Sequence, residues 1–176
     1  MIDVTLIDSM GSDLTVVNAA RVSFNKKSDW DEDNTLTVSD SILISYLARH
    51  KHMSPFGHCF ATFHVKAPVF VARQLVKHKF LRWNEVSRRY VDHEPEFYEP
   101  TTWRKRSKDK KQGSEGEITL GYKTISTLAK NAVWYRKTYK KLIDDGIAPE
   151  QARMTLPLSL MTEWYWSGSL DAWSDM

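Results

Sequence analysis

Residues 58–76, HCFATFHVKAPVFVARQLV, change their pattern at Pro68. The part before the proline is rich in aromatic and β-branched residues, which favour a strand. Proline is common as the first residue of a helix, because its missing N–H would have no intrahelical partner there. Beyond it the apolar residues fall at helical spacing, at Phe70, Val71, Leu75 and Val76. The stretch therefore predicts a strand that ends at Pro68 and a helix that begins with it.

Two elements are predicted near the N-terminus. Residues 2–8 alternate apolar and polar side chains, as an edge strand does. Residues 12–24 begin with a capping residue, Ser12 or Asp13, ahead of leucine, valine and alanine at helical spacing. We expect a strand followed by a helix.

A second helix is predicted over residues 39–50. It opens with Ser39 or Asp40 as a cap. The polar residues 25–37 before it predict a loop. One stripe of the helix is apolar and consists of Ile42, Leu43, Tyr46 and Leu47.

The C-terminal half holds a charged segment between apolar ones. Residues 104–117 combine many charges with glycine and serine, which predicts an exposed, mobile loop. Residues 118–145 have a long helical pattern that Gly146 would end, and Pro149 opens another helix. Residues 156–166, LPLSLMTEWYW, predict a strand or buried apolar structure. Strands mixed with long helices, without an internal repeat, predict one α/β or α+β domain over residues 1–176.

The composition is that of an ordinary globular protein. Hydrophobic residues make up 41% of the 176 residues and charged residues 27%. The formal net charge of +3 is too small to demand attachment to nucleic acid or to a membrane. Cys59 is the single cysteine, so no internal disulfide can form, and we expect a reducing compartment. We find no secretory signal and no apolar segment long enough to span a membrane, and we expect a cytoplasmic protein.

Positive charge is concentrated in residues 77–90, KHKFLRWNEVSRRY, around the single acid Glu85. Most such runs are solvated surfaces. Here Trp83, Val86 and Tyr90 interrupt the run, and arginine, lysine, asparagine and serine are the residue types that bind a nucleotide. Aromatic residues among cations can also bind nucleic acid, but the modest net charge places that alternative second.

Several other chemistries lack their motifs. The sequence contains no phosphate-binding GxxxxGK[ST] loop, no GxGxxG and no CxxC pair. Its histidines at 50, 52, 58 and 64 lack the spacing of a zinc site, so we predict no metal.

The basic stretch resembles the signature of the flavin-dependent thymidylate synthases, R-H-R-x-x-S-x-N-E-x-S-x-R-Y. Three more segments are similar to this family, MGSDLTVVNAARVSF, HKHMSPFGHCFATFHVKAPVFVARQ and ARMTLPLSLMTEWYWSG, so the resemblance covers nearly the whole chain from Leu6 onward. The positions that match the signature are His78, Asn84, Glu85, Ser87, Arg89 and Tyr90.

The resemblance implies a function and a fold. The family converts dUMP to dTMP with methylenetetrahydrofolate as carbon donor and with NADPH to reduce its FAD. Its members are homotetramers of a single α+β domain whose antiparallel-rich sheet is flanked by long helices. This route needs no cysteine nucleophile, and we expect Cys59 to lie in the core. We treat Ser87 as a substrate ligand, because no base stands at helical spacing to activate it.

The resemblance also assigns site residues. Those implied at the flavin are His52, Ser54, Lys77, His78, Lys79, Glu85, Ser169 and Asp175. Those implied around dUMP are Gln74, Glu85, Ser87, Arg88, Arg89 and Arg153.

The chain departs from the family pattern at several positions. Lys77 and Lys79 replace arginines, Arg82 replaces a serine and Gly57 stands where many members have an acid. The family continues beyond the position of Met176 with an arginine that contacts the uracil, so we assign no catalytic residue and expect flavin binding with poor turnover. One alternative is a protein that binds a nucleotide or flavin without turnover. Another is an enzyme that acts on a different pyrimidine nucleotide or makes a hydroxymethyl product. If the protein is viral, we expect it in the host cytoplasm.

Overall fold

The computed structural model describes residues 1–111 and 113–176. Its helices and strands are β1 (Asp3–Met10), α1 (Asp13–Arg21), η1 (Val22–Phe24), α2 (Val38–Arg49), η2 (Ser54–His58), β2 (Phe60–Pro68), α3 (Val69–Leu75), β3 (Arg82–Glu85), β4 (Trp103–Arg106), β5 (Ser114–Ile118), α4 (Tyr122–Asp144), α5 (Pro149–Ala152), η3 (Arg153–Thr155), β6 (Met161–Ser169) and α6 (Leu170–Ser174).

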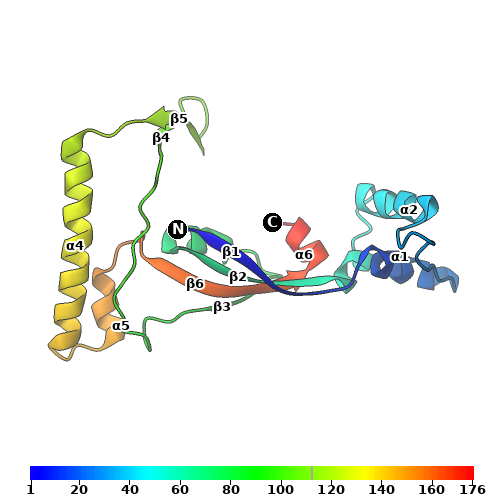
Figure 1. Cartoon of the computed structure of the whole chain (residues 1–176), viewed down its shortest axis with the longest axis horizontal. Helices are drawn as coiled ribbons and strands as arrows, with labels where there is room; N and C mark the ends of the chain where they lie inside the picture. The colour runs from blue at the N-terminus through cyan, green and yellow to red at the C-terminus, as the bar shows by residue number, and fades with distance from the viewer. Residues whose placement is uncertain (112) are drawn as a thin grey trace. The chain divides into compact units, whose positions relative to one another are not determined.

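The chain forms two compact units (Figure 1). The sheet unit comprises residues Asp3–Lys66, Arg73–Glu85 and Glu163–Met176. The α4 unit comprises residues Met1–Ile2, Ala67–Ala72 and Val86–Thr162. The sequence predicted a single domain over residues 1–176, which stays a prediction.

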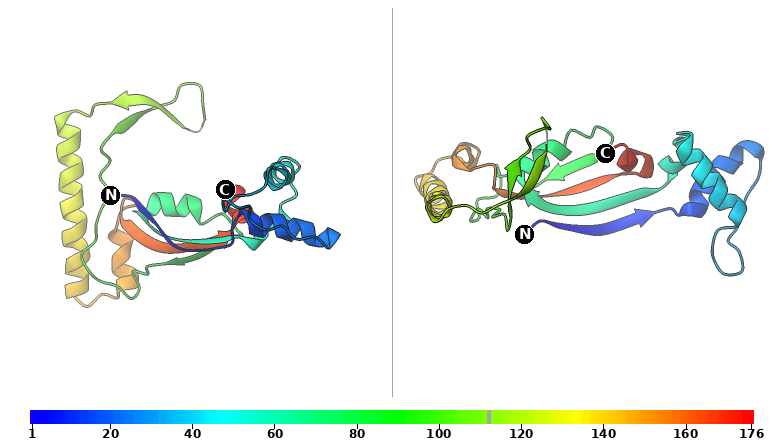
Figure 2. Two further views of the ribbon diagram at one scale, coloured as in Figure 1. Left: turned by 45° about the vertical axis from the view of Figure 1, so that its right-hand side comes forward. Right: turned by 90° about the horizontal axis from the view of Figure 1, so that it is seen from above.

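A four-stranded sheet with the order β1-β2-β6-β3 organises the sheet unit (Figure 2). β1 lies at its edge, as predicted, and pairs antiparallel with β2, with a register shift between Leu6 and Asp8. β3 pairs antiparallel with β6. The strand-to-helix change at Pro68 is confirmed, but the proline closes β2 and α3 begins at Val69. The mixed α+β fold with an antiparallel-rich sheet is thus confirmed.

Tryptophans form the core of the sheet unit. The predicted C-terminal strand is β6, which buries Trp164 and Trp166. The ring of Trp83 on β3 stacks on Trp164 with centroids 4.4 Å apart. Trp173 on α6 meets Trp166 edge to face at 4.8 Å. These large rings anchor β3 and α6 on the same strand, because aromatic rings bury much apolar area.

A smaller core lies between α1, α2 and η2 and contains Val16, Leu47, Phe56 and Cys59. Cys59 is therefore a core residue, as predicted. Burial raises the pKa of its thiol. The thiol donates a hydrogen bond to the Ser12 carbonyl at 3.4 Å. A buried, protonated thiol is unsuited to nucleophilic attack.

The predicted caps of the first two helices differ in outcome. Ser12 is the N-cap of α1, as predicted. Thr37 caps α2 instead of Ser39 or Asp40, because its hydroxyl accepts a hydrogen bond from the backbone N–H of Asp40 at 3.2 Å. The apolar stripe of α2 is only partly correct, since Leu47 is buried whereas Ile42 and Tyr46 are exposed.

The α4 unit is built on the 23-residue helix α4, with the short α5 beside it (Figure 1). Gly146 ends the helix region at φ +82°, as predicted, and its N–H bonds the Ile143 carbonyl. The loop predicted for residues 104–117 is wrong, because β4 and β5 pair antiparallel there, but both strands are exposed, as predicted. Ile118 belongs to β5 rather than to α4. Gln112, in that segment, lies outside the described residues. No helix among the described residues is long and apolar enough to cross a membrane.

Gly11 joins β1 to α1 in a conformation that suits glycine alone. Its φ is +92°, and an added Cβ would lie 2.7 Å from Cys59 Sγ and 3.1 Å from Cys59 Cα. We expect Gly11→Ala to lower the free energy of unfolding by about 2 kcal/mol, because backbone strain costs roughly 1–2 kcal/mol and Cys59 must also shift. Urea unfolding measures the change.

Gly116→Ala is the matched control for Gly11→Ala. Gly116 also has a positive φ, of +53°, but no atom lies within 4 Å of an added Cβ. This variant should lose about 1 kcal/mol. An equal loss in both variants would show that crowding against Cys59 contributes nothing.

Candidate functional site

The residues predicted to bind flavin and those predicted to bind phosphate lie in different units, and each set is described within its own unit. The sheet unit contains His52, Ser54, Gln74, Lys77, His78, Lys79, Glu85, Ser169 and Asp175. The α4 unit contains Ser87, Arg88, Arg89 and Arg153.

Lys77, His78 and Lys79 lie in the turn between α3 and β3. The turn starts with a hydrogen bond from the N–H of His78 to the Leu75 carbonyl at 3.1 Å. Both lysines are exposed, whereas the His78 ring is half-buried with its centroid 6.4 Å from that of Trp166. The His78 ring thus lies near the tryptophan core, and the residues on both sides of it in the sequence carry exposed ammonium groups that an anion could approach.

Ser54 begins η2 and His52 lies two residues before it, and both side chains are exposed. The His52 ring belongs to a group of rings at the end of α2. Its centroid lies 6.0 Å from that of Tyr46 and 6.4 Å from that of His50. These exposed rings offer stacking to a planar ligand, and the hydroxyl of Ser54, two residues after His52, offers a hydrogen bond.

Ser169 and Asp175 bracket α6, as its N-cap and C-cap. α6 contacts η2, and the N–H of Leu170 donates to the Cys59 carbonyl at 2.8 Å. The elements that carry Ser54 and Ser169 therefore pack together in the sheet unit.

Gly57 lies close to Asp171 of α6. An added Cβ at Gly57 would lie 3.6 Å from Asp171 Oδ1. That oxygen is buried and has no hydrogen-bond partner among the described residues. A carboxylate at position 57 would therefore lie close to the partly buried carboxylate of Asp171, which like-charge repulsion disfavours. The sequence alone could not identify Asp171, because its contact with Gly57 is tertiary.

Gln74 and Glu85 are the two remaining predicted ligands in the sheet unit. Gln74 is exposed on α3. Glu85 ends β3 opposite Trp164, and its Oε2 accepts a hydrogen bond from Trp83 Nε1 at 3.1 Å. Alternation along β3 places Arg82 and Asn84 on the other face of the sheet from Glu85. The signature residues of this strand, Asn84 and Glu85, thus lie on opposite faces of the sheet.

Ser87, Arg88 and Arg89 form a turn in the α4 unit. The Ser87 carbonyl accepts hydrogen bonds from the N–H groups of Tyr90 at 3.0 Å and Val91 at 3.2 Å. Ser87 Oγ accepts from the N–H of Arg89 at 3.3 Å. The hydroxyl therefore stabilises the turn.

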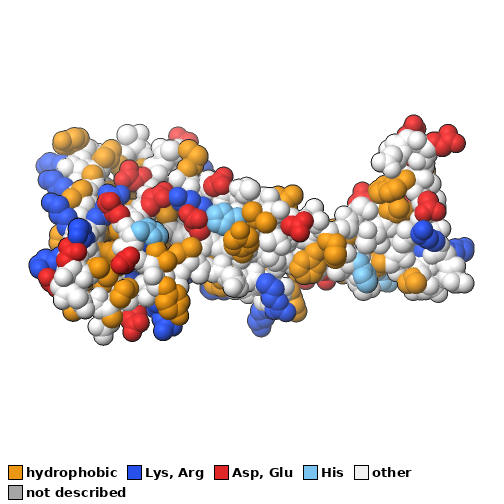
Figure 3. Space-filling view, turned by 60° about the horizontal axis from the view of Figure 1, so that its bottom comes forward, with side chains coloured by type: hydrophobic (Ala, Val, Ile, Leu, Met, Phe, Trp, Pro, Cys, Tyr) orange, Lys and Arg blue, Asp and Glu red, His pale blue; other side chains and the backbone are white. Residues whose placement is uncertain are grey.

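Two of the predicted phosphate ligands, Arg89 and Arg153, converge on Glu150. Arg89 Nε lies 3.9 Å from Glu150 Oε2, and Arg153 Nε donates to the Glu150 backbone carbonyl at 3.2 Å. Both arginine side chains are exposed. Two exposed guanidinium groups that each contact Glu150, one at its carboxylate and one at its carbonyl, are suited to bind a dianionic phosphate. Figure 3 shows further Lys and Arg side chains over α4.

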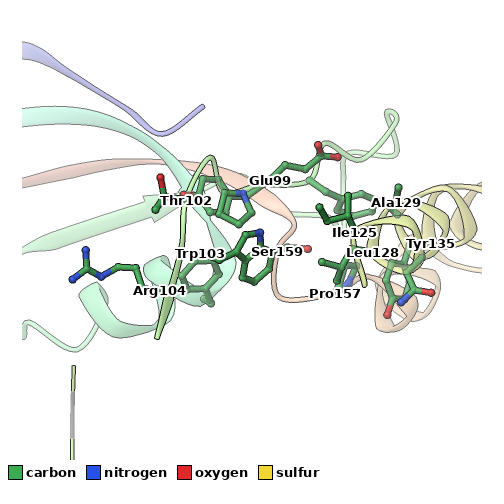
Figure 4. A pocket seen from close by; sticks show the side chains of 16 residues that line it. Glu99, Thr102, Trp103, Arg104, Ile125, Leu128, Ala129, Tyr135, Pro157 and Ser159 are labelled. Atoms are coloured by element: carbon green, nitrogen blue, oxygen red, sulfur yellow. The ribbon is translucent and has the colours of Figure 1, made fainter. Parts of the chain in front are cut away.

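A cavity of about 640 Å³ in the α4 unit is apolar and lies elsewhere. Ile125, Leu128 and Tyr135 of α4 line it together with Trp103, while the guanidinium of Arg104 points away from them (Figure 4). None of the predicted site residues lines this cavity. We place the candidate anion site at Arg89 and Arg153, because a phosphate needs cations.

Comparison with known proteins decides the family. Residues 5–176 match the model of the thymidylate synthase complementing protein family. The chain belongs to this family. It is 45% identical over 168 residues to the flavin-dependent thymidylate synthase of Thermus thermophilus, which covers 95% of this chain and 59% of the relative. It is 44% identical over 169 residues to that of Treponema denticola, covering 93% of this chain and 61% of the relative.

A solved family-like structure agrees with this assignment. The UMP/dUMP methylase PolB from Streptomyces cacaoi, bound with 5-Br dUMP, superposes with a TM-score of 0.81 at 35% identity, covering 98% of this chain and 74% of PolB. The chain spans about three fifths of the length of the curated family relatives.

Proposed function

We propose that this chain is a flavin-dependent thymidylate synthase that methylates dUMP to dTMP. The carbon donor would be methylenetetrahydrofolate, and NADPH would reduce the bound FAD. Family membership supports this proposal, together with the names of the relatives at 44–45% identity. The observation that carries it is the convergence of exposed Arg89 and Arg153 at Glu150, which suits a nucleotide phosphate.

The residues of the sheet unit fit FAD by their chemistry. Lys77 and Lys79 are exposed ammonium groups that would neutralise its two phosphates. Half-buried His78, whose ring centroid lies 6.4 Å from that of Trp166, would present its imidazole to the ring system, and Ser54 and Ser169 would offer hydroxyl groups. When bound, FAD supplies the electrons that reduce the transferred one-carbon unit.

On the nucleotide side, this chain's residues bind and orient. Arg89 and Arg153 of the α4 unit would hold the phosphate. Gln74 and Glu85 of the sheet unit carry groups that can hydrogen-bond a base or a ribose, and family resemblance alone names them as ligands. Ser87 would stabilise its turn and bind the substrate, and it would not act as a nucleophile. We propose no catalytic acid or base among these residues.

Release of tritium from C5 of dUMP tests the function, because methylation replaces the hydrogen on this carbon. We expect release that depends on both NADPH and methylenetetrahydrofolate, from protein that is yellow when purified. Omitting each co-substrate in turn provides the control. A yellow protein that binds dUMP but releases no tritium would support the alternative of a binding protein without turnover. A colourless protein that does not bind dUMP would contradict the proposal.

The same assay distinguishes related reactions. The likeness to PolB, described as a UMP/dUMP methylase, makes UMP the first competing nucleotide to test. Mass spectrometry of the product separates a methyl from a hydroxymethyl group, which differ by one oxygen.

We also propose a cytoplasmic homo-oligomer, with a homotetramer as the expected state. Large apolar side chains are exposed on α4, including Tyr122 at 84% and Trp134 at 58%. Exposed apolar surface of this kind is typical of interfaces. Light scattering after gel filtration measures the mass in solution, and a monomer at micromolar concentration would contradict this assignment.

A further inference from the structure

Arg88 and Arg89 are neighbours in sequence, but their guanidinium groups have different surroundings. Arg88 Nη1 donates to the His93 carbonyl, and Nη2 lies 3.3 Å from His93 Nε2. The Arg88 Cζ atom lies over the ring of Tyr139 on α4, 5.9 Å from its centroid. Arg88 thus bonds its own turn through at most two of its five N–H donors and contacts a helix with the face of its guanidinium.

Tyr139 provides a rigid support for this contact. It is 1% exposed, and it is the residue that α4 buries most completely. Its hydroxyl has no hydrogen-bond partner among the described residues, so the ring face rather than the hydroxyl contacts Arg88. A cation over an aromatic face is attracted by the ring quadrupole, more strongly where water is excluded.

Arg89 is oriented differently. More than half of its side chain is exposed, and its charge partner, Glu150, is 3.9 Å away and equally exposed. Its Cζ atom also lies over a ring, 5.6 Å from the centroid of Tyr90, but this ring is 79% exposed and offers no buried support. α5, which carries Glu150, also contacts α4. The turn with Arg89 and the helix that leads to Arg153 are therefore both supported by α4.

We propose that Arg88 is a positioning residue rather than a nucleotide ligand. It fixes the turn of residues 87–93 on Tyr139 and so directs Arg89 towards the phosphate that Arg153 also binds. This assignment rests on the proposed function and changes one of its details, because the family resemblance places Arg88 among the substrate ligands.

Salt dependence of dUMP affinity separates the two roles. A cation that contacts phosphate adds to the slope of log Kd against log salt concentration, because salt screens the attraction. We expect Arg89→Leu to weaken binding and to flatten this slope. Arg88→Leu should weaken binding about two- to thirtyfold, the value of a cation–π contact, with the wild-type slope retained.

Tyr139 variants test the ring contact. Tyr139→Leu removes the ring face and should reproduce the effect of Arg88→Leu. Tyr139→Phe keeps the ring and loses only the unpartnered hydroxyl, so it should bind dUMP as the wild type does. A loss in Tyr139→Phe as large as in Tyr139→Leu would overturn the role of the ring.

Arg136→Leu is the matched control. Arg136 also bonds a carbonyl, that of Pro95 at 3.3 Å, and lies over an aromatic ring, that of Phe97 at 5.1 Å. It belongs to the same unit, and its partners Glu94, Pro95 and Phe97 are not among the predicted ligands. We expect wild-type affinity and slope.

Hydrogen exchange of the nucleotide-free chain tests directly whether the contact of Arg88 with Tyr139 fixes the turn. The amides of Tyr90 and Val91 donate to the Ser87 carbonyl. They should exchange at least about threefold faster in Arg88→Leu and Tyr139→Leu than in the wild type. Their exchange rate should be unchanged in Arg136→Leu. Unchanged exchange in the first two variants, or a flattened salt slope in Arg88→Leu, would overturn the proposal. If the wild type does not bind dUMP, the proposed function fails, but the exchange result still decides whether Arg88 and Tyr139 fix the turn.

Discussion

Replacing Asp40 by alanine is expected to lower the free energy of unfolding by about 3–4 kcal/mol. The Asp40 side chain is almost fully buried between α1 and α2. Its Oδ1 accepts hydrogen bonds from Nε and Nη2 of Arg21 and from Ser28 Oγ, and its Oδ2 accepts from Thr37 Oγ1. Alanine leaves all of these donors without their acceptor. The loss should lie at the lower end of the range for a broken buried pair, because Arg21 is about one quarter exposed and can still reach water.

Asp144→Ala is the matched control for Asp40→Ala. Asp144 pairs with Lys140 at 2.7 Å on α4, but both side chains are more than half exposed. Such an i,i+4 pair contributes only about 0.3–0.5 kcal/mol. Urea unfolding of both variants measures the difference, and a loss below about 1 kcal/mol in Asp40→Ala would show that the network does not stabilise the fold.

The same network predicts a pH dependence of stability. Burial alone would raise the pKa of Asp40, but hydrogen bonds from Arg21, Thr37 and Ser28 and the charge of Arg21 outweigh it, so the pKa lies below the usual value of 3.8. The stabilisation is complete above the unfolded pKa, near 3.9, and is lost as the pH falls through the folded value. Asp40→Asn should therefore lose less stability between pH 5 and pH 2 than the wild type.

Asp40 also shows why the sequence misassigned a cap. Serine, threonine and aspartate all suit an N-cap, so local propensity could not choose among positions 37, 39 and 40. The deciding contact is with Arg21, 19 residues earlier in the chain. That contact buries the aspartate inside the first turn and leaves Thr37 to cap the helix. Long, strongly patterned elements such as α4 and β2 were predictable because their signals are local.

The hairpin of β4 and β5 was missed for a related reason. Its residues are charged on both strands, and a charged segment with glycine favours a loop when read one residue at a time. In the structure Arg104 pairs with Glu117, and Lys105 with Glu115. Opposite charges directly across two strands stabilise the pairing, and this complementarity appears only once the register is known.

For the candidate site, sequence resemblance identified residues but not their geometry. The family resemblance placed Arg88 and Arg89 together among the dUMP ligands, although only Arg89 matches a fixed position of the signature. Their different directions depend on Tyr139 and Glu150, which lie about 50 and 60 residues further along the chain. Glu150 carried one local signal, because it stands three residues before Arg153 and such residues share a helical face.

Arg89→Ala and Arg153→Ala are each expected to weaken dUMP binding about ten- to a hundredfold. Each change removes a charge-assisted hydrogen bond to the phosphate, which contributes roughly 1.5–3 kcal/mol. The existing contact of Arg89 with Glu150 does not compete strongly. Its atoms are 3.9 Å apart and both side chains are more than half exposed, and such pairs contribute at most about 1 kcal/mol. A dianionic phosphate should therefore attract both arginines.

Titration calorimetry with dUMP and with deoxyuridine, which lacks the phosphate, makes the test specific. Both variants should lose affinity for dUMP and keep the wild-type affinity for deoxyuridine. Arg106→Ala, at an exposed arginine of β4, provides the control and should bind both ligands normally. An equal loss for the nucleotide and the nucleoside would mean that the arginines contact the base or the ribose. Unchanged dUMP affinity in both Arg89→Ala and Arg153→Ala would remove the phosphate site from the α4 unit altogether.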